Sequence, residues 1–158
     1  MIEVEIEVPD WPRALADAEA LARRAGEAAL AGARAQGDVV VLLTDDEAIA
    51  ALNLQFRAKP GPTNVLSFPS PESARPHLGD VAVALGVTSR EAAEQGKSLA
   101  HHLTHLVAHG VLHLVGYDHE SEAEAEIMEA LERRVLAGLG APDPYAPQPD
   151  TSGAGDGD

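Results

Sequence analysis

The amino-acid sequence predicts a single α+β domain, in which a small mixed four-stranded sheet is packed with about five helices. Its 158 residues are enough for one domain with a sizeable core. Four short segments with strand-like patterning are interspersed with five segments of helical patterning. One of these helices, residues 98–115, is apolar on most of its sides, so we expect it to lie buried at the centre of the fold.

The N-terminal part of the chain is predicted to form a strand followed by a long helix. Residues 2–8 alternate between Ile or Val and Glu, the period of two that is typical of a half-buried strand. Pro9 ends this strand. Asp10 as N-cap and Pro12 in the first turn then predict one helix that continues to about residue 35.

The middle of the chain contains two further strands around a helix. Residues 39–43 are a continuous Val and Leu run, which indicates a strand in the interior of the sheet. The sequence Thr44-Asp-Asp-Glu47 fits a capping box and predicts a helix to about residue 56. After a loop at 57–62, residues 65–68 are predicted to form a short strand that prolines terminate.

The second half begins with the fourth strand and is otherwise helical. Residues 79–84 are predicted to be a strand, and a capping box at Thr88 predicts a short helix that ends near residue 96. The central helix follows at 98–115, and a third capping box at Ser121 opens the final helix. The inner face of that final helix is marked by Ile127, Met128, Leu131 and Val135.

Composition excludes several classes of protein. A net charge of −15 argues against a general nucleic-acid or membrane-surface coat. The chain has no cysteine, so it has neither disulfides nor thiolate ligands, and a metal ion would be bound by His and carboxylate side chains. We expect a cytoplasmic protein with one domain at residues 1–147 and a disordered acidic tail at 148–158.

Residues 109–119 carry the strongest indication of function. His109, His113 and His119 stand at i, i+4 and i+10, with Gly116 between the second and the third. His109 and His113 share a helix face, because four residues advance the face by only about 40°. A turn at Gly116 would bring His119 back toward them. The segment predicts one Zn²⁺ on three protein ligands with one position open, the arrangement of a catalytic zinc site.

His105 offers an alternative pair with His109. His105 and His113 are about 12 Å apart along the helix axis, so one ion cannot bind both. The turn that returns the third histidine favours His109 with His113. His105 is then expected to support a ligand or to pack beside it, whereas His101 and His102 are expected to be structural or exposed.

The same spacing occurs in metzincin proteases, in which a glutamate after the first histidine is the general base. Gly110 stands at that position here, so the spacing favours metal-assisted hydrolysis but not peptide hydrolysis by that route. In the turn, Asp118 either accepts a hydrogen bond from a ligand imidazole or only stabilises the turn.

Two cations, Arg57 and Lys59, lie in a region otherwise poor in charge. One interpretation is that they stabilise the C-terminus of the preceding helix, where positive charge is favourable. The other is that they bind a phosphate group beside the metal ion. From the sequence alone the two interpretations are about equally supported.

The first of two longer motifs runs from Asn53 through Arg57 to Thr63-Asn-Val-Leu-Ser-Phe-Pro69. The second is the segment 109–119, followed by Glu126-Ile-Met-Glu-Ala-Leu-Glu132. Together they resemble the YbeY family of bacterial zinc-dependent endoribonucleases, which act in ribosomal RNA maturation and ribosome quality control. The resemblance extends from the first strand to about Tyr145. One departure is Asn64, where many members have Asp. An amide at this position keeps the hydrogen bonds of the carboxylate but loses its charge.

The resemblance implies a set of roles and partners. The zinc ligands would be His109, His113 and His119, and Arg57 would be the basic residue needed for activity on RNA. The substrate would be single-stranded or ribosomal RNA, with ribosomal proteins or an assembly GTPase as candidate partners and no membrane. Because the chain is acidic overall, a local positive rim is expected to bind the RNA. Its members would be Arg57 and Lys59, with Arg75 as a further candidate.

The leading hypothesis is therefore a zinc-dependent endoribonuclease specific for single strands. A second hypothesis is a non-catalytic zinc-containing ribosome assembly factor, in which a fourth protein ligand, His105 or Asp118, would close the site. A third is a metal-dependent hydrolase of another substrate, which the glycine at position 110 disfavours when that substrate is a peptide.

Overall fold

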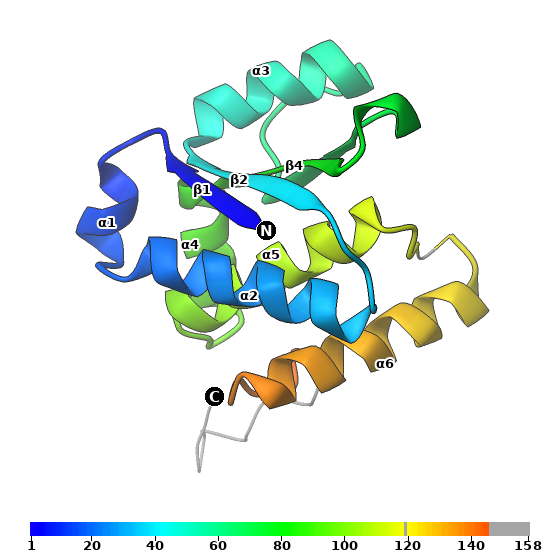
Figure 1. Ribbon diagram of the computed structural model, residues 1–158. Helices are drawn as coiled ribbons and strands as arrows, with labels where there is room; N and C mark the ends of the chain where they lie inside the picture. Colours follow the sequence, from blue (N-terminus) through cyan, green and yellow to red (C-terminus); the bar gives the residue numbers. More distant parts are fainter. Residues whose placement is uncertain (119, 146–158) are drawn as a thin grey trace.

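A four-stranded mixed sheet with helices on both faces organises the chain, as the computed structural model shows for residues 1–118 and 120–145 (Figure 1). The predicted α+β fold class is confirmed. In chain order the elements are β1 (Ile2–Ile6), α1 (Asp10–Ala14), α2 (Ala18–Gly32), β2 (Asp38–Thr44), α3 (Asp46–Arg57), β3 (Val65–Pro69), η1 (Glu72–Ala74), β4 (His77–Ala84), α4 (Leu85–Glu94), α5 (Leu99–Leu114) and α6 (Glu122–Gly138).

The strands lie in the order β1-β2-β4-β3. β1 and β4 both run parallel to β2, with Val41 of β2 paired to Val4 on one side and to Val81 on the other. β3 is antiparallel to β4 and, as the last strand in this order, forms one edge of the sheet. The apolar run at 39–43 is thus an interior strand, as its continuous hydrophobicity predicts.

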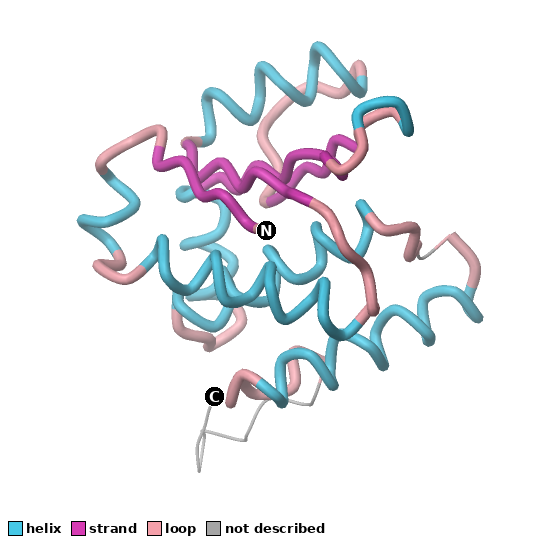
Figure 2. Tube along the Cα trace, viewed as in Figure 1, coloured by secondary structure: helices cyan, strands magenta, loops and turns pink. Residues whose placement is uncertain are grey.

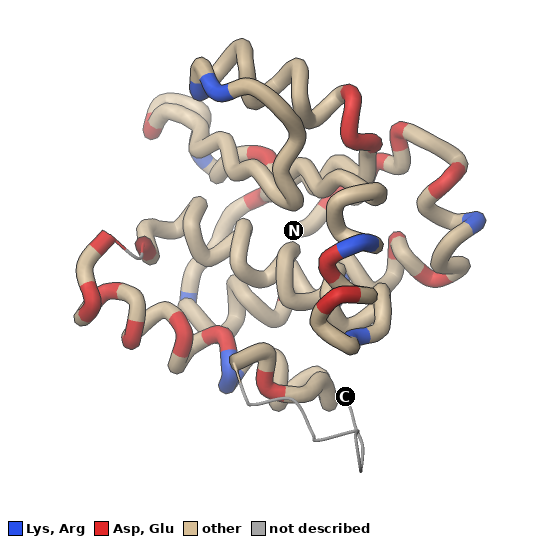
Figure 3. The backbone as a smooth tube through the Cα atoms, turned by 180° about the vertical axis from the view of Figure 1, so that it is seen from behind, with Lys and Arg blue, Asp and Glu red and all other residues tan. Residues whose placement is uncertain are grey.

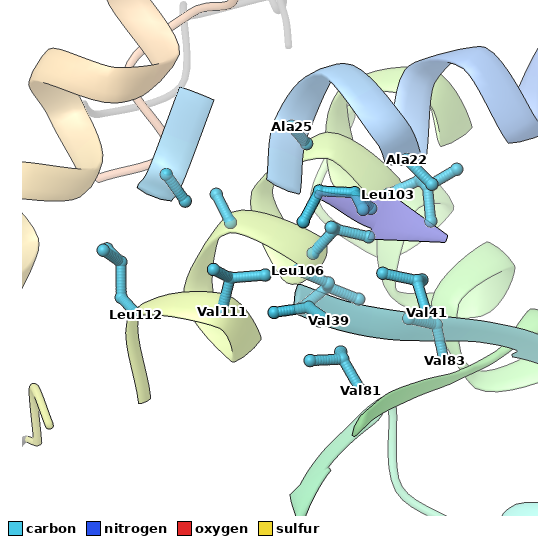
Figure 4. Close-up of a cluster of buried hydrophobic side chains, with 14 of the residues drawn as sticks. Ala22, Ala25, Val39, Val41, Val81, Val83, Leu103, Leu106, Val111 and Leu112 are labelled. Atoms are coloured by element: carbon cyan, nitrogen blue, oxygen red, sulfur yellow. The ribbon is translucent and has the colours of Figure 1, made fainter. Parts of the chain in front are cut away.

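The helices form unequal layers on the two faces of the sheet (Figures 1 and 2). α3 lies alone on one face, over a small core of Ile49, Leu66, Ala82 and Ala84. α2 and α5 cover the other face, and α6 packs outside them. Between the sheet and α2 and α5 lies the main core, which Figure 4 shows as interdigitated aliphatic side chains from β2, β4, α2 and α5. α5, the predicted central helix, is buried along most of its length.

The predicted single helix at 10–35 is wrong in one respect, because the segment forms two helices, α1 and α2. They are separated at Leu15–Asp17, where Leu15 adopts an extended conformation. Trp11 is fully buried, and its indole N–H donates to the carbonyl of Thr44 at 2.9 Å. This anchor on the end of β2 fixes the direction of α1, while α2 follows the sheet and the central helix.

Of the three predicted capping boxes, the one at the start of α6 is confirmed. The Ser121 hydroxyl accepts from the Glu124 backbone N–H, and the Glu124 carboxylate accepts from that of Ser121. At the start of α3 the N-cap is Asp45 rather than Thr44, because β2 extends through Thr44.

The box predicted at Thr88 is wrong, since α4 begins at Leu85 and Thr88 lies inside it. The N-terminal N–H groups of a helix need outside acceptors. Here the Asp46 carboxylate of α3 accepts from the backbone N–H of Val87 at 3.0 Å and pairs with Arg90 at 3.2 Å. A side chain from a neighbouring helix therefore replaces a local cap.

None of the helices in the part of the chain covered by residues 1–118 and 120–145 is long and apolar enough to cross a membrane. The predicted boundary at 147/148 and the predicted acidic tail lie outside those residues.

Candidate functional site

The last two turns of α5 bring His109 and His113 together, as their i, i+4 spacing predicts. Their rings lie 4.6 Å apart, centroid to centroid, and the two Nε2 atoms are 3.1 Å apart. Two nitrogens that each coordinate one tetrahedral zinc ion at about 2.0–2.1 Å are themselves about 3.4 Å apart. The two Nε2 atoms therefore converge on one point at nearly the spacing that a shared metal ion requires.

The predicted turn at Gly116 is confirmed and ends α5. Gly116 has a φ of +106°, which L side chains rarely adopt. Its N–H donates to the His113 carbonyl at 3.1 Å, and the N–H of Tyr117 donates to the Leu112 carbonyl at 3.1 Å. These two bonds form a Schellman motif, which reverses the chain beside His113. The third predicted ligand, His119, lies outside the described residues, so its role stays a prediction.

A buried carboxylate is hydrogen-bonded to His109 at the ring nitrogen that does not face His113. Glu132 of α6 is fully buried, and its Oε2 accepts a hydrogen bond from Nδ1 of His109. Its Oε1 accepts a hydrogen bond from the Tyr145 hydroxyl and lies 3.4 Å from Nε2 of His105. Three side chains from two distant segments thus meet at one carboxyl group.

These contacts keep Glu132 ionised. Burial by itself would raise the pKa of Glu132, but the hydrogen bonds from His105, His109 and Tyr145 outweigh burial and lower it to about 2. The pKa of the Tyr145 phenol is raised, by burial first and then by its hydrogen bond to the carboxylate. At neutral pH Glu132 is therefore an acceptor on both oxygens, and Tyr145 is a donor.

His105, His109 and Glu132 offer ligand atoms that all lie within 4.8 Å of one another, so this group could bind a metal ion. That would be the alternative pair of the sequence prediction, His105 with His109. In the structure, however, Nδ1 of His109 is already bonded to Glu132 on this side. Nε2 of His109 points the other way, toward His113. His105 thus lies on the Glu132 side of His109.

A pocket of about 780 Å³ opens on the His109 and His113 side of α5. Arg57 and Lys59 line it together with both histidines, so the structure brings the predicted cations and the predicted ligands to one cavity. Asp118 lines it as well. Arg75 is not among the described residues around this pocket, and its guanidinium instead donates to the His77 carbonyl at 3.2 Å.

Arg57 is held at the rim by β3. It is the last residue of α3, and its Nη2 donates to the Ser67 carbonyl at 3.4 Å. Ala58 follows in the left-handed conformation and ends the helix, which directs the chain toward Lys59. Figure 3 shows this basic stretch at the end of α3 on a molecule where acidic residues dominate, most densely along α6.

Gly110 lies on the face of α5 that packs against the sheet. A Cβ built on it would stand 2.7 Å from Cγ1 of the buried Val81. Its carbonyl accepts from the Ser67 hydroxyl at 3.1 Å, which ties β3 to α5. A glutamate at this position would therefore collide with Val81 of β4. The structure strengthens the argument against a metzincin-type general base.

Asn64 links the pocket wall to a second buried network. Its Oδ1 accepts from the backbone N–H of Val65 at 2.6 Å, and its Nδ2 donates to Glu91 at 2.9 Å. The same Glu91 oxygen lies 2.9 Å from Nε2 of His102, whose pKa is lowered mainly by burial. His102 is thus a structural histidine and His101 is exposed, as predicted.

Two residues of this site, Glu132 and Tyr145, received no role from the sequence motifs. For Glu132 a signal existed, because it shares the inner face of α6 with Met128, Leu131 and Val135. A single carboxylate within an apolar stripe indicates a buried partner. For Tyr145 no local pattern was available, since it lies beyond the last helix.

Known proteins resemble this chain along most of its length. A profile of the family Endoribonuclease YbeY matches residues 6–140. A protein of Rhodopseudomonas palustris (strain HaA2), named Endoribonuclease YbeY, is 52% identical, over 92% of this chain and 82% of its own. The chain belongs to the YbeY family.

Other YbeY relatives agree with this assignment. The Endoribonuclease YbeY of Maricaulis maris (strain MCS10) is 57% identical over 71% of this chain and 70% of its own. Among solved structures, the solution structure of TM1509 from Thermotoga maritima superposes with a TM-score of 0.55 at 25% identity. It covers 93% of this chain and 100% of that protein. This chain and that protein thus share their fold over nearly the whole length that the comparison covers.

Proposed function

We propose that this protein is a zinc-dependent endoribonuclease that cleaves single-stranded RNA and acts in ribosomal RNA maturation and ribosome quality control. The observation that carries the proposal is that Nε2 of His109 and Nε2 of His113 converge in the same pocket that Arg57 and Lys59 line. The family name of the relatives, Endoribonuclease YbeY, supports the reaction class. Ribosomal proteins or an assembly GTPase would present the RNA, in the cytoplasm.

The donor set fits a single zinc ion. Two imidazole nitrogens point to one site at 3.1 Å from each other, and His119 is the proposed third ligand. When bound, zinc would polarise a phosphoryl oxygen and lower the pKa of water at the open position. His105 lies on the Glu132 side of His109, which argues against a fourth histidine that would close the site.

Arg57 and Lys59 would bind the substrate phosphate. The guanidinium has five N–H donors, and its bond to the Ser67 carbonyl uses one of them. That bond holds the side chain against β3, so the guanidinium is oriented before RNA enters. Arg57 would thereby stabilise the negative charge that develops on the phosphate, whereas Lys59 would add a point charge at the rim.

The first prediction tests this function with a single-stranded RNA, zinc-loaded protein and two substitutions. We expect the cleavage rate of His113→Ala to fall at least 100-fold together with its bound zinc, because two ligands hold the ion far less firmly. Arg57→Ala should keep its zinc and cleave about 100-fold more slowly, which is the effect of removing one charge-stabilising donor. Cleavage is measured on gels, and zinc content by elemental analysis.

Arg23→Ala is the matched control, because Arg23 lies on α2 and pairs with Glu19 at 3.0 Å. It should cleave at the wild-type rate. The nuclease proposal fails if zinc-loaded wild type leaves the RNA intact, or if both site variants cleave as fast as wild type. If Arg57→Ala alone is fully active, the metal chemistry stands and the role of Arg57 in binding phosphate does not.

A further inference from the structure

We propose that Glu132 is the positioning residue of the metal site: its carboxylate fixes the tautomer of His109, and the Tyr145 hydroxyl holds that carboxylate in place. The inference rests on the proposed function only in that it takes His109 and His113 as metal ligands. Glu132 itself is bonded to Nδ1 of His109 and does not line the pocket, so it would not contact an ion bound by Nε2 of His109 and of His113.

The burial of Glu132 is the first observation. Its side chain is fully buried on an α6 face that otherwise packs through aliphatic residues. A buried carboxylate is strongly unfavourable unless hydrogen bonds compensate it, so a purely structural position would be better filled by Leu or Met. The presence of a carboxylate here indicates a task that an apolar side chain does not perform.

The task indicated by the geometry of His109 is to fix which of its ring nitrogens carries the proton. A neutral imidazole carries its proton on either Nδ1 or Nε2, and only the bare nitrogen can bind a metal ion. A carboxylate accepts hydrogen bonds, and Oε1 of Glu132 already accepts from the Tyr145 hydroxyl, so the contact of Oε2 with Nδ1 places the His109 proton on Nδ1. The Nε2 lone pair is then directed at the point that it shares with His113, 3.1 Å from that residue's Nε2.

Tyr145 completes the arrangement from a distant part of the chain. Its hydroxyl donates to Oε1 of Glu132, so the carboxylate is held at both oxygens. The ring lies edge-on to His105 with centroids 5.6 Å apart, and the Arg133 guanidinium lies 5.3 Å from its centroid. The segment after α6 is thus fastened over the side of the site that faces away from the pocket.

The second prediction concerns zinc affinity and the tautomer of His109. Zinc binding is measured by competition with a chromophoric chelator, and the tautomer by ¹⁵N NMR of the zinc-free protein. Glu132→Gln should bind zinc about 10–100-fold more weakly, as is usual when the partner of a ligand histidine is lost. The amide can either accept from Nδ1 or donate to it, so His109 should become a mixture of tautomers. Tyr145→Phe should lose affinity about fivefold, the effect of one hydrogen bond.

Glu126→Gln is the matched control, because it removes the same charge from an exposed position on the same helix. It should retain wild-type affinity and tautomer. If Glu132→Gln does not fold, the wild-type NMR measurement and Tyr145→Phe still decide the matter. The inference is overturned if zinc-free wild type carries the His109 proton on Nε2, or if folded Glu132→Gln binds zinc as wild type does.

None of these readouts involves RNA cleavage. A protein that cuts no RNA but shows the fixed tautomer and the loss of affinity would contradict the proposed function and support the role of Glu132. If wild type cleaves RNA but Glu132→Gln binds zinc as tightly as wild type, the proposed function is supported and the role of Glu132 is contradicted.

Discussion

The amide nitrogen of Asn64 gives the Glu91 carboxylate a hydrogen-bond donor that an aspartate could not provide. Its amide donates to Glu91, which is also bonded to His102, while its Oδ1 accepts from Val65. An aspartate at this position could keep the bond from Val65. It would then place a second carboxylate oxygen within hydrogen-bond distance of Glu91. The amide is therefore matched to this chain's own neighbour.

The third prediction is that Asn64→Asp destabilises the protein in a pH-dependent way. Two carboxylates in contact raise the pKa of one of them in the folded state. The variant should therefore match wild type near pH 4, where one carboxyl is protonated. As the pH rises through that raised pKa, it should lose about 1–3 kcal/mol of unfolding free energy. Urea unfolding at pH 4.5 and pH 8 measures this difference.

Glu91→Gln added to Asn64→Asp is the control for that experiment. The new amide can donate to Asp at 64, so much of the stability at pH 8 should return. Equal unfolding free energies of wild type and Asn64→Asp at pH 8 would show that the carboxylate pair is not formed.

At the scale of elements, the approach of α5 to the sheet positions the site. The contact depends on Gly110, which packs against Val81 and whose carbonyl is bonded to Ser67. Because His109 precedes and His113 follows on the same helix, a shift of α5 away from β4 would displace both side chains relative to Arg57 across the pocket.

The fourth prediction is that Gly110→Ala destabilises the fold and weakens zinc binding, although Ala is the better helix former. The added methyl would lie 2.7 Å from a rigid, buried valine methyl, and such overpacking costs about 1–3 kcal/mol. This exceeds the gain of about 1 kcal/mol that Gly-to-Ala exchange gives in a helix. Urea midpoints and chelator competition measure the two effects.

Gly138→Ala serves as its control, since a Cβ there meets no described atom within 4 Å at the end of α6. It should leave stability unchanged or slightly raised. If Gly110→Ala is as stable as Gly138→Ala, the close helix–sheet approach does not govern the position of α5.

The elements that the sequence predicts well are those whose pattern is local. β2, α5 and the start of α6 follow from an apolar run, an apolar helix and a capping box within their own residues. The break between α1 and α2 does not, because Trp11 is anchored on a carbonyl 33 residues away. Likewise, the start of α4 depends on Asp46, 41 residues from the N–H that it accepts.

The same distinction applies to the site. The spacing of His109 and His113 predicts their convergence, since one helix turn separates them. The position of Arg57 in the same pocket is suggested in the sequence by charge alone. In the structure it depends on the pairing of β3 with β4. Glu132 meets His109 from 23 residues away, and Tyr145 meets His105 from 40 residues away, and periodicity does not encode such tertiary contacts.

At the scale of the whole molecule, the net charge of −15 opposes the binding of RNA, whereas the proposed function requires the pocket to attract it. Of 11 basic residues in the sequence, Arg57 and Lys59 are the two that line the pocket among the described residues. Charges separated by more than about 10 Å are screened at 0.1 M salt, whereas direct phosphate contacts act at short range. Attraction therefore depends on few contacts, and salt weakens the general repulsion.

The fifth prediction follows from this balance and concerns the salt dependence of RNA binding. Two phosphate contacts to a single strand give a slope of log affinity against log salt of about −1.4, or about a sevenfold loss between 50 and 200 mM. Screening of the acidic surface should make the slope shallower still. Fluorescence anisotropy of a labelled single-stranded RNA with zinc-free protein measures it without cleavage. Arg57→Ala and Lys59→Ala should each reduce the slope by about 0.7, whereas Arg23→Ala should not. A wild-type slope steeper than about −3 would require basic contacts beyond these two and would contradict the assignment of phosphate binding to this rim.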